Sequence, residues 1–280
     1  MLNTTLIFTR VPSHAGTATL GFAAAGVELL DFPLQHIGPP ADLARFHAAL
    51  AALPQTDLAI PVSPTAVAAV FAALQGVWPA RCAIGVVGEG SLAAVRRALT
   101  AQPEDAPWPR LIAPQAGEAS GAEGDSEALW DALQLAFPPG PLSTFPWAGR
   151  HVLIFRGGAG RDLLQHQLES AGAKVRVVEA YSRLAPEYDA HTAGQLRKAL
   201  GCGGWWLFSS SEAVRNLQRL LEQAGLGSAV LQQQRALAIH GRIAQALQSA
   251  GFGRVELTRA PPEAVLSALQ RLEASSPPHS

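Results

Sequence analysis

Short apolar runs alternate along the chain with longer stretches in which apolar residues recur every three or four positions. The short runs are typical of buried strands, and the longer stretches, many opened by Ser, Asp or Gly, are typical of helices. We expect strands at residues 4–9, 27–37, 58–62, 81–87, 111–113, 151–155, 174–186, 205–208, 236–239 and 255–258. We expect helices at residues 13–25, 41–52, 92–101, 126–136, 189–200, 212–224, 243–250 and 262–273, with two more after Ser63 and after the turn at 156–162. Strands that alternate with helices predict parallel sheets covered on both faces, which is an α/β fold.

One strand and the turn that follows it stand at the centre of this pattern. Residues 151–155 form an apolar run, and residues 156–162, Arg-Gly-Gly-Ala-Gly-Arg-Asp, form a polar turn that opens a helix. Open α/β sheets bind ligands where a strand ends in such a turn, because free N–H groups and the helix dipole meet there. Arg156, Gly157 and Arg161 in this turn therefore favour an anionic ligand.

A long extended run, residues 174–186, follows that helix. It carries Glu179, Tyr181 and Arg183 at every second position, so regular strand geometry predicts that the three side chains share one face. Tyr181 in an extended run is more often a packed aromatic than a functional phenol. Both interpretations stay open at this point.

The two halves of the chain resemble each other. Residues 60–67, Ile-Pro-Val-Ser-Pro-Thr-Ala-Val, align with residues 207–214, Leu-Phe-Ser-Ser-Ser-Glu-Ala-Val. Residues 90–93 align with residues 241–244 in the same order. The common order indicates a duplication, and a length of 280 residues also suits two similar α/β domains.

Composition and charge exclude several classes of function but do not identify one. Apolar residues make up 48% of the chain and charged residues 15%, as in a globular protein with a large core. Lys and Arg total 21 against 22 for Asp and Glu, so no global basic field favours nucleic acid as a partner. Cys82 and Cys202 stand far apart, which disfavours a metal site or a disulfide framework and suits a reducing compartment. With no leader and no apolar run of membrane-spanning length, we expect a cytoplasmic protein that binds no membrane.

Four turns are expected at the carboxyl ends of strands, where each offers backbone N–H groups at a helix start. Any one of them is more often a plain helix cap, but four in two matching domains predict a shared anion-binding cleft. Arg10, after the first strand, adds a cation. The turns are Ser63-Pro64-Thr65, Gly88-Glu89-Gly90-Ser91, Ser209-Ser210-Ser211 and His240-Gly241-Arg242.

Other chemistries have weaker signals. Residues 88–93 fit the GxGxxA fingerprint of dinucleotide binding, but the acidic residue expected after the next strand is missing, because residues 111–113 run into Pro114. A nucleotide-dependent α/β enzyme stays an alternative. His240 is a candidate for catalysis or for plain capping, and no Ser, His and Asp set or carboxylate pair is spaced for hydrolysis.

Nearly the whole chain resembles the uroporphyrinogen-III synthase family. The most specific similarity is residues 156–164, Arg-Gly-Gly-Ala-Gly-Arg-Asp-Leu-Leu, followed by Leu168, Gly172-Ala173, Val175 and the ending Tyr181-Ser-Arg-Leu-Ala-Pro186. Residues 208–214, 62–67 and 88–91 resemble the family's other turns. The sequence departs at residues 240–243, His-Gly-Arg-Ile, where the family commonly has a glycine turn leading to a Thr. That departure leaves Arg242 to supply charge where a hydroxyl is usual.

The resemblance implies a layout. It implies two flavodoxin-like parallel-sheet domains joined by a two-stranded linker. One domain would comprise residues 1–33 and 185–280, the other residues 39–175, and residues 34–38 and 176–184 would be the linker strands.

The resemblance also implies a reaction, the cyclisation of hydroxymethylbilane to uroporphyrinogen III with loss of water and inversion of ring D. The substrate is a polycarboxylate, ionised at neutral pH, and no cofactor or metal is implied. Tyr181 would help the ring A hydroxyl leave as a hydrogen-bond donor rather than a strong acid. The enzyme would act as a monomer. The residues expected to bind substrate are Arg10, Ser63, Pro64, Thr65, Gly88, Ser91, Arg156, Gly157, Arg161, Ser209, Ser210, Ser211, His240 and Arg242. A non-catalytic module that senses a tetrapyrrole or another anion is the competing interpretation.

Overall fold

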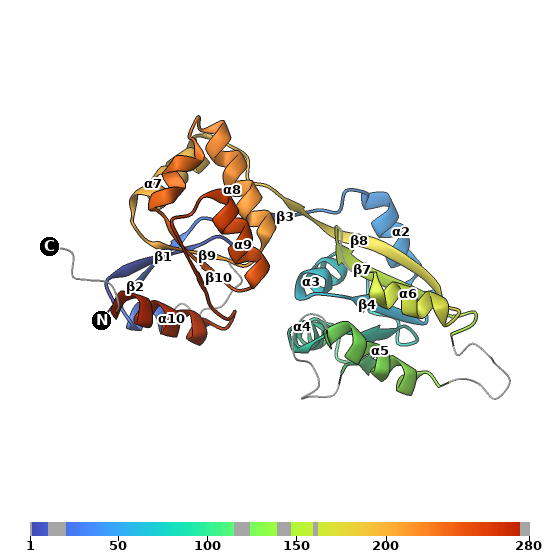
Figure 1. Ribbon diagram of the computed structural model, residues 1–280. Coiled ribbons are helices and arrows are strands. Elements are labelled where there is room, and N and C mark those ends of the chain that lie inside the picture. The colour runs from blue at the N-terminus through green and yellow to red at the C-terminus, as the bar shows by residue number, and fades with distance from the viewer. Residues whose placement is uncertain (1, 11–20, 115–123, 139–146, 159–161, 275–280) are drawn as a thin grey trace. The chain divides into compact units, whose positions relative to one another are not determined.

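The computed structural model describes residues 2–10, 21–114, 124–138, 147–158 and 162–274, and Figure 1 shows their fold. Contacts divide the chain into two compact units, residues 1–37 with 184–280, and residues 38–183. Each unit has a sheet with helices on both faces, so the predicted α/β class with two parallel-sheet domains is confirmed. We call them the terminal unit and the middle unit.

The terminal unit contains a five-stranded parallel sheet in the order β11-β10-β9-β1-β2. Its strands are β1 Thr4–Phe8, β2 Val27–Asp31, β9 Trp205–Phe208, β10 Arg235–Ala238 and β11 Arg254–Leu257. Helices α7, α8 and α9 cover one face and α10 the other, because alternate strand residues point to opposite sides. The helices are α7 Ala190–Gly201, α8 Ser211–Gln223, α9 Gly241–Ala250 and α10 Pro262–Ala274, with a 3-10 turn at Ser228–Gln233.

The middle unit is built on a six-stranded sheet in the order β3-β8-β7-β4-β5-β6. Its strands are β3 His36–Gly38, β4 Leu58–Pro61, β5 Ala83–Gly85, β6 Leu111–Ile112, β7 His151–Gly157 and β8 Lys174–Leu184. Helices α2, α3 and α4 pack on one face, and α5 and α6 pack on the other. The helices are α2 Leu43–Ala51, α3 Pro64–Ala73, α4 Glu89–Thr100, α5 Gly124–Ala136 and α6 Leu163–Ser170, with a 3-10 turn at Leu53–Gln55.

The expected single strand at residues 27–37 is two strands. It breaks after β2 at residues 32–35 and resumes as β3. Pro33 explains the break, because it has no N–H to donate to a neighbouring strand. Its neighbours Phe32 and Leu34 are fully buried and pack with the helices of the terminal unit. The helix expected at residues 13–25 falls largely outside the described residues.

The predicted repeat corresponds to a shared strand-to-helix connection. Ser63 follows β4 and its hydroxyl accepts a hydrogen bond from the backbone N–H of Ala66 at 3.1 Å. Ser210, its partner in the alignment, follows β9 and accepts one from Ala213 at the same distance. Both serines are therefore helix N-caps, which stabilise the first turn of α3 and α8.

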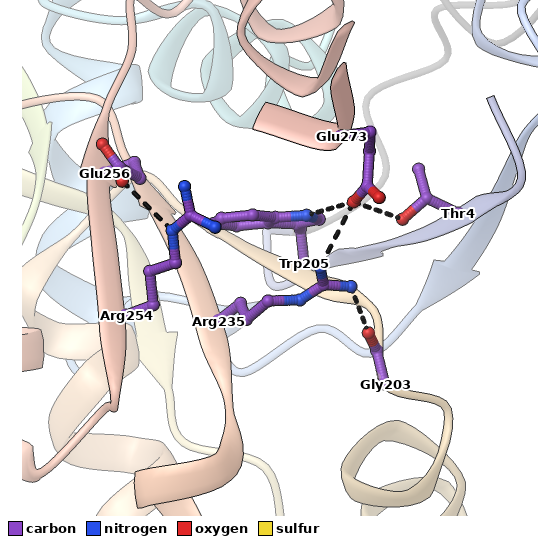
Figure 2. A network of polar contacts seen from close by, with 7 residues as sticks. All are labelled: Thr4, Gly203, Trp205, Arg235, Arg254, Glu256 and Glu273. Atoms are coloured by element: carbon purple, nitrogen blue, oxygen red, sulfur yellow. Dashed lines mark hydrogen bonds and ion pairs between the residues drawn. The ribbon is translucent and has the colours of Figure 1, made fainter. Parts of the chain in front are cut away.

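A polar network at the amino ends of the strands holds α10 against the terminal sheet. Figure 2 shows the Glu273 carboxylate next to the first residues of three strands. One oxygen accepts a bond from the buried Trp205 indole N–H at 2.8 Å, and from Arg235 and Thr4 at 3.3 Å each. The guanidinium carbons of Arg235 and Arg254 lie 4.8 and 5.2 Å from the centre of the Trp205 ring. This end of the sheet is opposite the carboxyl ends where the candidate turns lie.

Candidate functional site

Tyr181 lies near the end of β8 in the middle unit. Val175 and Val177 pack on one face of the sheet, and Val178 and Ala180 pack on the other, as regular alternation requires. Tyr181 packs in the same cluster as Val178 and Ala180, although alternation would put it on the opposite side. The prediction that Tyr181 shares a face with Glu179 is therefore wrong.

The cause is an irregularity in the pairing of β7 with β8. Arg156 pairs with Glu179, but Gly157 pairs with Tyr181, so one residue of β8 is left over. Such an extra residue is a β-bulge, which turns the following side chain to the other face and often aims it at a functional site. Glu179 does not share the face of Tyr181, and its carboxylate accepts a hydrogen bond from the Ser182 hydroxyl.

Two polar groups reach the phenol oxygen of Tyr181. The Ser63 hydroxyl lies 3.3 Å away, and the Arg183 guanidinium donates to it at 3.4 Å. The Arg183 guanidinium carbon also lies 5.9 Å from the centre of the Tyr181 ring. Both polar contacts are longer than the usual hydrogen-bond length of about 2.7–3.2 Å.

Gly157 lies directly against the Tyr181 ring. A Cβ atom at this position would overlap the Cε2 and Cζ atoms of the ring and lie 2.8 Å from its oxygen. Gly157 is also the last residue of β7, so its backbone is held by the sheet. Only glycine at this position leaves space for the ring.

The turn that begins with Ser63 lies next to the turn that begins with Gly88. A Cβ at Gly90 would meet the Pro64 ring at 3.5 Å, and Pro64 stands in the first turn of α3. Gly88 is the N-cap of α4 and provides no side-chain cap. The first N–H groups of α4 therefore have no side-chain acceptor at the cap, which suits an anion.

Two hydroxyls of the middle unit differ in their exposure. Thr65 is half-buried in the first turn of α3. Helix α4 begins at Glu89, earlier than expected, so Ser91 lies inside the helix and is only 3% exposed. This burial disfavours the predicted contact of Ser91 with substrate.

Arg156 is engaged in an ion pair. Its guanidinium lies 2.8 Å from the carboxylate of Asp162. This ion pair joins the first and last residues of the turn at 156–162. The Arg156 side chain is 19% exposed. Arg161, the other cation predicted for this turn, lies outside the described residues.

In the terminal unit the three consecutive serines have different environments. Ser210 caps α8, and Ser209 is half-buried just after β9. The Ser211 hydroxyl oxygen is buried and has no hydrogen-bond partner among the described residues. Thr9, which the sequence did not single out, is 1% exposed and donates to the backbone carbonyl of Leu207 at 2.7 Å.

His240 caps α9 with its ring. Its Nδ1 accepts a hydrogen bond from the backbone N–H of Arg242 at 3.2 Å. Both side chains are exposed, so Arg242 presents a cation at the amino end of α9, where the family commonly has a Thr. Arg10 is also exposed, with its guanidinium carbon 5.8 Å from the centre of the Phe8 ring.

Neither a metal cluster nor a membrane span is found in the described part of the chain. No three His, Cys, Asp or Glu side chains come close enough there to hold a metal ion. None of the helices described there is long and apolar enough to cross a bilayer.

Comparison with known proteins gives a consistent family. Residues 17–267 match the family model described as uroporphyrinogen-III synthase HemD. The chain is 31% identical over 230 residues to the uroporphyrinogen-III synthase of Synechococcus elongatus, covering 79% of this chain and 76% of that protein. It is 33% identical over 190 residues to the uroporphyrinogen-III synthase of Salmonella typhimurium, covering 66% and 67% of the two chains.

Solved structures show the same fold. The uroporphyrinogen-III synthetase of Helicobacter pylori superposes with a TM-score of 0.59 at 13% identity, covering 96% of this chain and 99% of that one. A mutant uroporphyrinogen III synthase of Thermus thermophilus superposes with a TM-score of 0.52 at 19% identity, covering 97% and 100%.

Proposed function

The chain belongs to the uroporphyrinogen-III synthase family, and we propose that the residues around Tyr181 carry out the ring closure of that family. The enzyme is a cyclising lyase that converts hydroxymethylbilane into uroporphyrinogen III, with loss of water and inversion of ring D. The observation that carries the proposed site is the phenol of Tyr181 at the carboxyl edge of the sheet, between a helix-capping serine and an arginine. The chain is proposed to work as a monomer in the cytoplasm.

The first chemical step needs a donor. The ring A hydroxyl of the substrate leaves as water only if its oxygen gains a proton as the carbon–oxygen bond breaks. Tyr181 supplies a hydrogen bond, and then that proton, to this oxygen. The azafulvenium cation that remains is attacked through a spiro intermediate, and the proton lost on closure returns to the phenol. The net change is loss of one water.

Access to the phenol requires one side chain to move. Tyr181 is 3% exposed, so the hydroxyl meets a substrate only after a neighbouring group shifts. Arg183 is that group, because it is exposed and its guanidinium lies beside both the oxygen and the ring. Its long side chain can turn away toward a substrate carboxylate at small cost.

Helix amino ends and exposed cations bind the substrate carboxylates. In the middle unit the first N–H groups of α4 have no side-chain cap and can donate to a carboxylate. One exposed contact of this kind contributes about 0.3–1 kcal/mol, so several act together on a polycarboxylate. Holding the flexible chain in the shape that gives the inverted product contributes more than any single acid or base.

The β3 and β8 strands support the proposed linker. They are neighbours in one sheet, and each crosses a boundary between the two units, at residues 37–38 and 183–184. We propose that residues 34–38 and 176–184 are the two linker strands between residues 1–33 with 185–280 and residues 39–175.

Isomer analysis tests the function directly. The purified protein is given enzymatically generated hydroxymethylbilane, and the uroporphyrinogen products are separated. Uroporphyrinogen III is the expected product. Formation of isomer I alone would mean that the substrate closed without catalysis, and would favour a non-catalytic anion-binding module.

A further inference from the structure

The Tyr181 hydroxyl is useful to the proposed chemistry only if its proton points at the substrate. Arginine side chains have N–H donors and no acceptor, so Arg183 can only donate to the phenol oxygen. Ser63 can donate or accept, and just one proton can lie between its oxygen and that of Tyr181, 3.3 Å apart. The direction of the Ser63 bond therefore decides where the Tyr181 proton goes.

The helix cap favours Ser63 as the donor. The Ser63 oxygen already accepts the Ala66 N–H at 3.1 Å, and it stands at the positive end of α3. A hydroxyl whose oxygen accepts a hydrogen bond becomes a better donor through its own proton, because chains of hydrogen bonds polarise one another. The phenol oxygen can accept a hydrogen bond from the Ser63 hydroxyl. The phenol's own proton is then not used in the bond to Ser63 and can be donated to another group.

Packing fixes the ring while the hydrogen bond fixes the hydroxyl. A Cβ at Gly157 would overlap the ring, and the ring belongs to the same buried cluster as Val178 and Ala180. The ring of Tyr181 therefore has little freedom, and rotation about its carbon–oxygen bond is what remains to be set. Ser63 reaches that oxygen and is itself held by its helix.

We propose that Ser63 is a positioning residue that acts through Tyr181, donating to the phenol oxygen so that the Tyr181 proton points outward. This inference rests on the proposed role of Tyr181 in ring closure. It changes the role expected from sequence, in which Ser63 was a substrate-binding residue. A substrate-binding serine would alter KM, whereas a positioning serine alters kcat.

The test is a double-mutant cycle with Ser63→Ala, Tyr181→Phe and the combined variant, in which initial rates of uroporphyrinogen III formation over a range of substrate concentrations give kcat and KM. Ser63→Ala is expected to lower kcat about tenfold, the rate equivalent of one hydrogen bond, with KM changed by less than about twofold. In the Tyr181→Phe background the same change is expected to have no further effect on kcat, because no phenol remains to be positioned.

Two controls separate the hydroxyl from the helix cap. Ser63→Thr keeps both the hydroxyl and the cap, and is expected to retain kcat within about threefold. Asp42→Ala removes the N-cap of α2, whose carboxylate accepts the Arg45 N–H at 2.8 Å in the same unit. This variant is expected to lose stability as Ser63→Ala does, but to keep its kcat.

Three results would overturn the positioning role while leaving the proposed function intact. A rise in KM without a fall in kcat would assign Ser63 to substrate binding. An unchanged or increased kcat in Ser63→Ala would mean that Tyr181 donates to Ser63. Independent effects that multiply in the combined variant would mean that Ser63 acts without Tyr181. Full activity of Tyr181→Phe would instead remove Tyr181 from the mechanism, and the proposal with it.

Discussion

No atom larger than hydrogen fits between the Gly157 backbone and the ring of Tyr181. The two residues face each other across the β7–β8 pair, at the place where the register shifts by one residue. The bulge turns Tyr181 toward α3, and the missing side chain of Gly157 provides the space that the ring then fills. The position of the phenol thus depends on both residues.

Gly157→Ala is expected to displace the Tyr181 ring, since the new methyl group would overlap two ring atoms. Overpacking of this kind costs about 1–3 kcal/mol of unfolding free energy, and a misplaced catalytic group costs about 100-fold in rate. Thermal unfolding and kcat measure the two effects. Gly194→Ala in α7 is the matched control, because a Cβ there meets open space, and it should leave kcat unchanged. A Gly157→Ala variant with normal kcat would contradict the role given to the ring position.

Tyr181→Phe keeps the ring and removes the hydroxyl. Because the packing of the ring stays the same, the melting temperature is expected to change little, while kcat falls about 100-fold through loss of the proton donor. The measurement is the initial rate of uroporphyrinogen III formation beside a thermal unfolding curve. Unchanged turnover would remove the phenol from the mechanism.

Glu273→Ala is expected to destabilise the terminal unit by about 1–3 kcal/mol, because the buried Trp205 N–H loses its acceptor. Denaturant unfolding measures the change, and kcat at saturating substrate should stay the same, since the network lies at the amino ends of the strands. Glu256→Ala removes the exposed ion pair with Arg254, and should cost less than about 1 kcal/mol. Equal losses of unfolding free energy in the two variants would show that the bond from the Trp205 indole to Glu273 contributes no more than an exposed ion pair.

The two cysteines should differ sharply toward thiol reagents. Cys82 is fully buried, and burial, with a smaller contribution from the Asp57 carboxylate, raises the pKa of its thiol to about 12. Because the thiolate is the reactive form, Cys82 should label only in unfolded protein, while the exposed Cys202 labels in the native state. Mass spectrometry after alkylation at pH 8 should find one modified site, and modification of Cys82 under native conditions would contradict its burial.

The same pKa implies a loss of stability at high pH. The folded state holds the Cys82 proton up to about 12, whereas the unfolded thiol loses it near about 8.5, so the folded state binds more protons in between. The free energy of unfolding should therefore fall as pH rises through that window. Measured between pH 8 and pH 10, wild-type protein should lose more stability than Cys82→Ala, which has no thiol to titrate. Equal slopes would mean that burial does not hold the proton.

The local elements followed from the sequence because their determinants are local. The apolar run at residues 205–208 is β9 to the residue, and Ser63 and Ser210 cap their helices as expected. An N-cap side chain accepts a hydrogen bond from the backbone N–H three residues later, so the neighbouring residues are enough to predict it. The internal repeat could be predicted for the same reason, since it compares the local sequence of one strand-to-helix connection with that of another.

The site needed information from distant parts of the chain. Ser63 and Tyr181 are separated by 118 residues, and nothing in either segment indicates that their hydroxyls meet. Ser91 has the same polar side chain as the capping serines but is buried, because α4 begins before it.

By itself the sequence determined the α/β class, the order of the elements and the serine caps, because hydrophobic period and capping depend on residues a few positions apart. Only the tertiary structure decided which face of β8 carries Tyr181 and which groups meet its oxygen. The register of β7 against β8 and the absence of a side chain at Gly157 set that face. These are relations between segments brought together by folding.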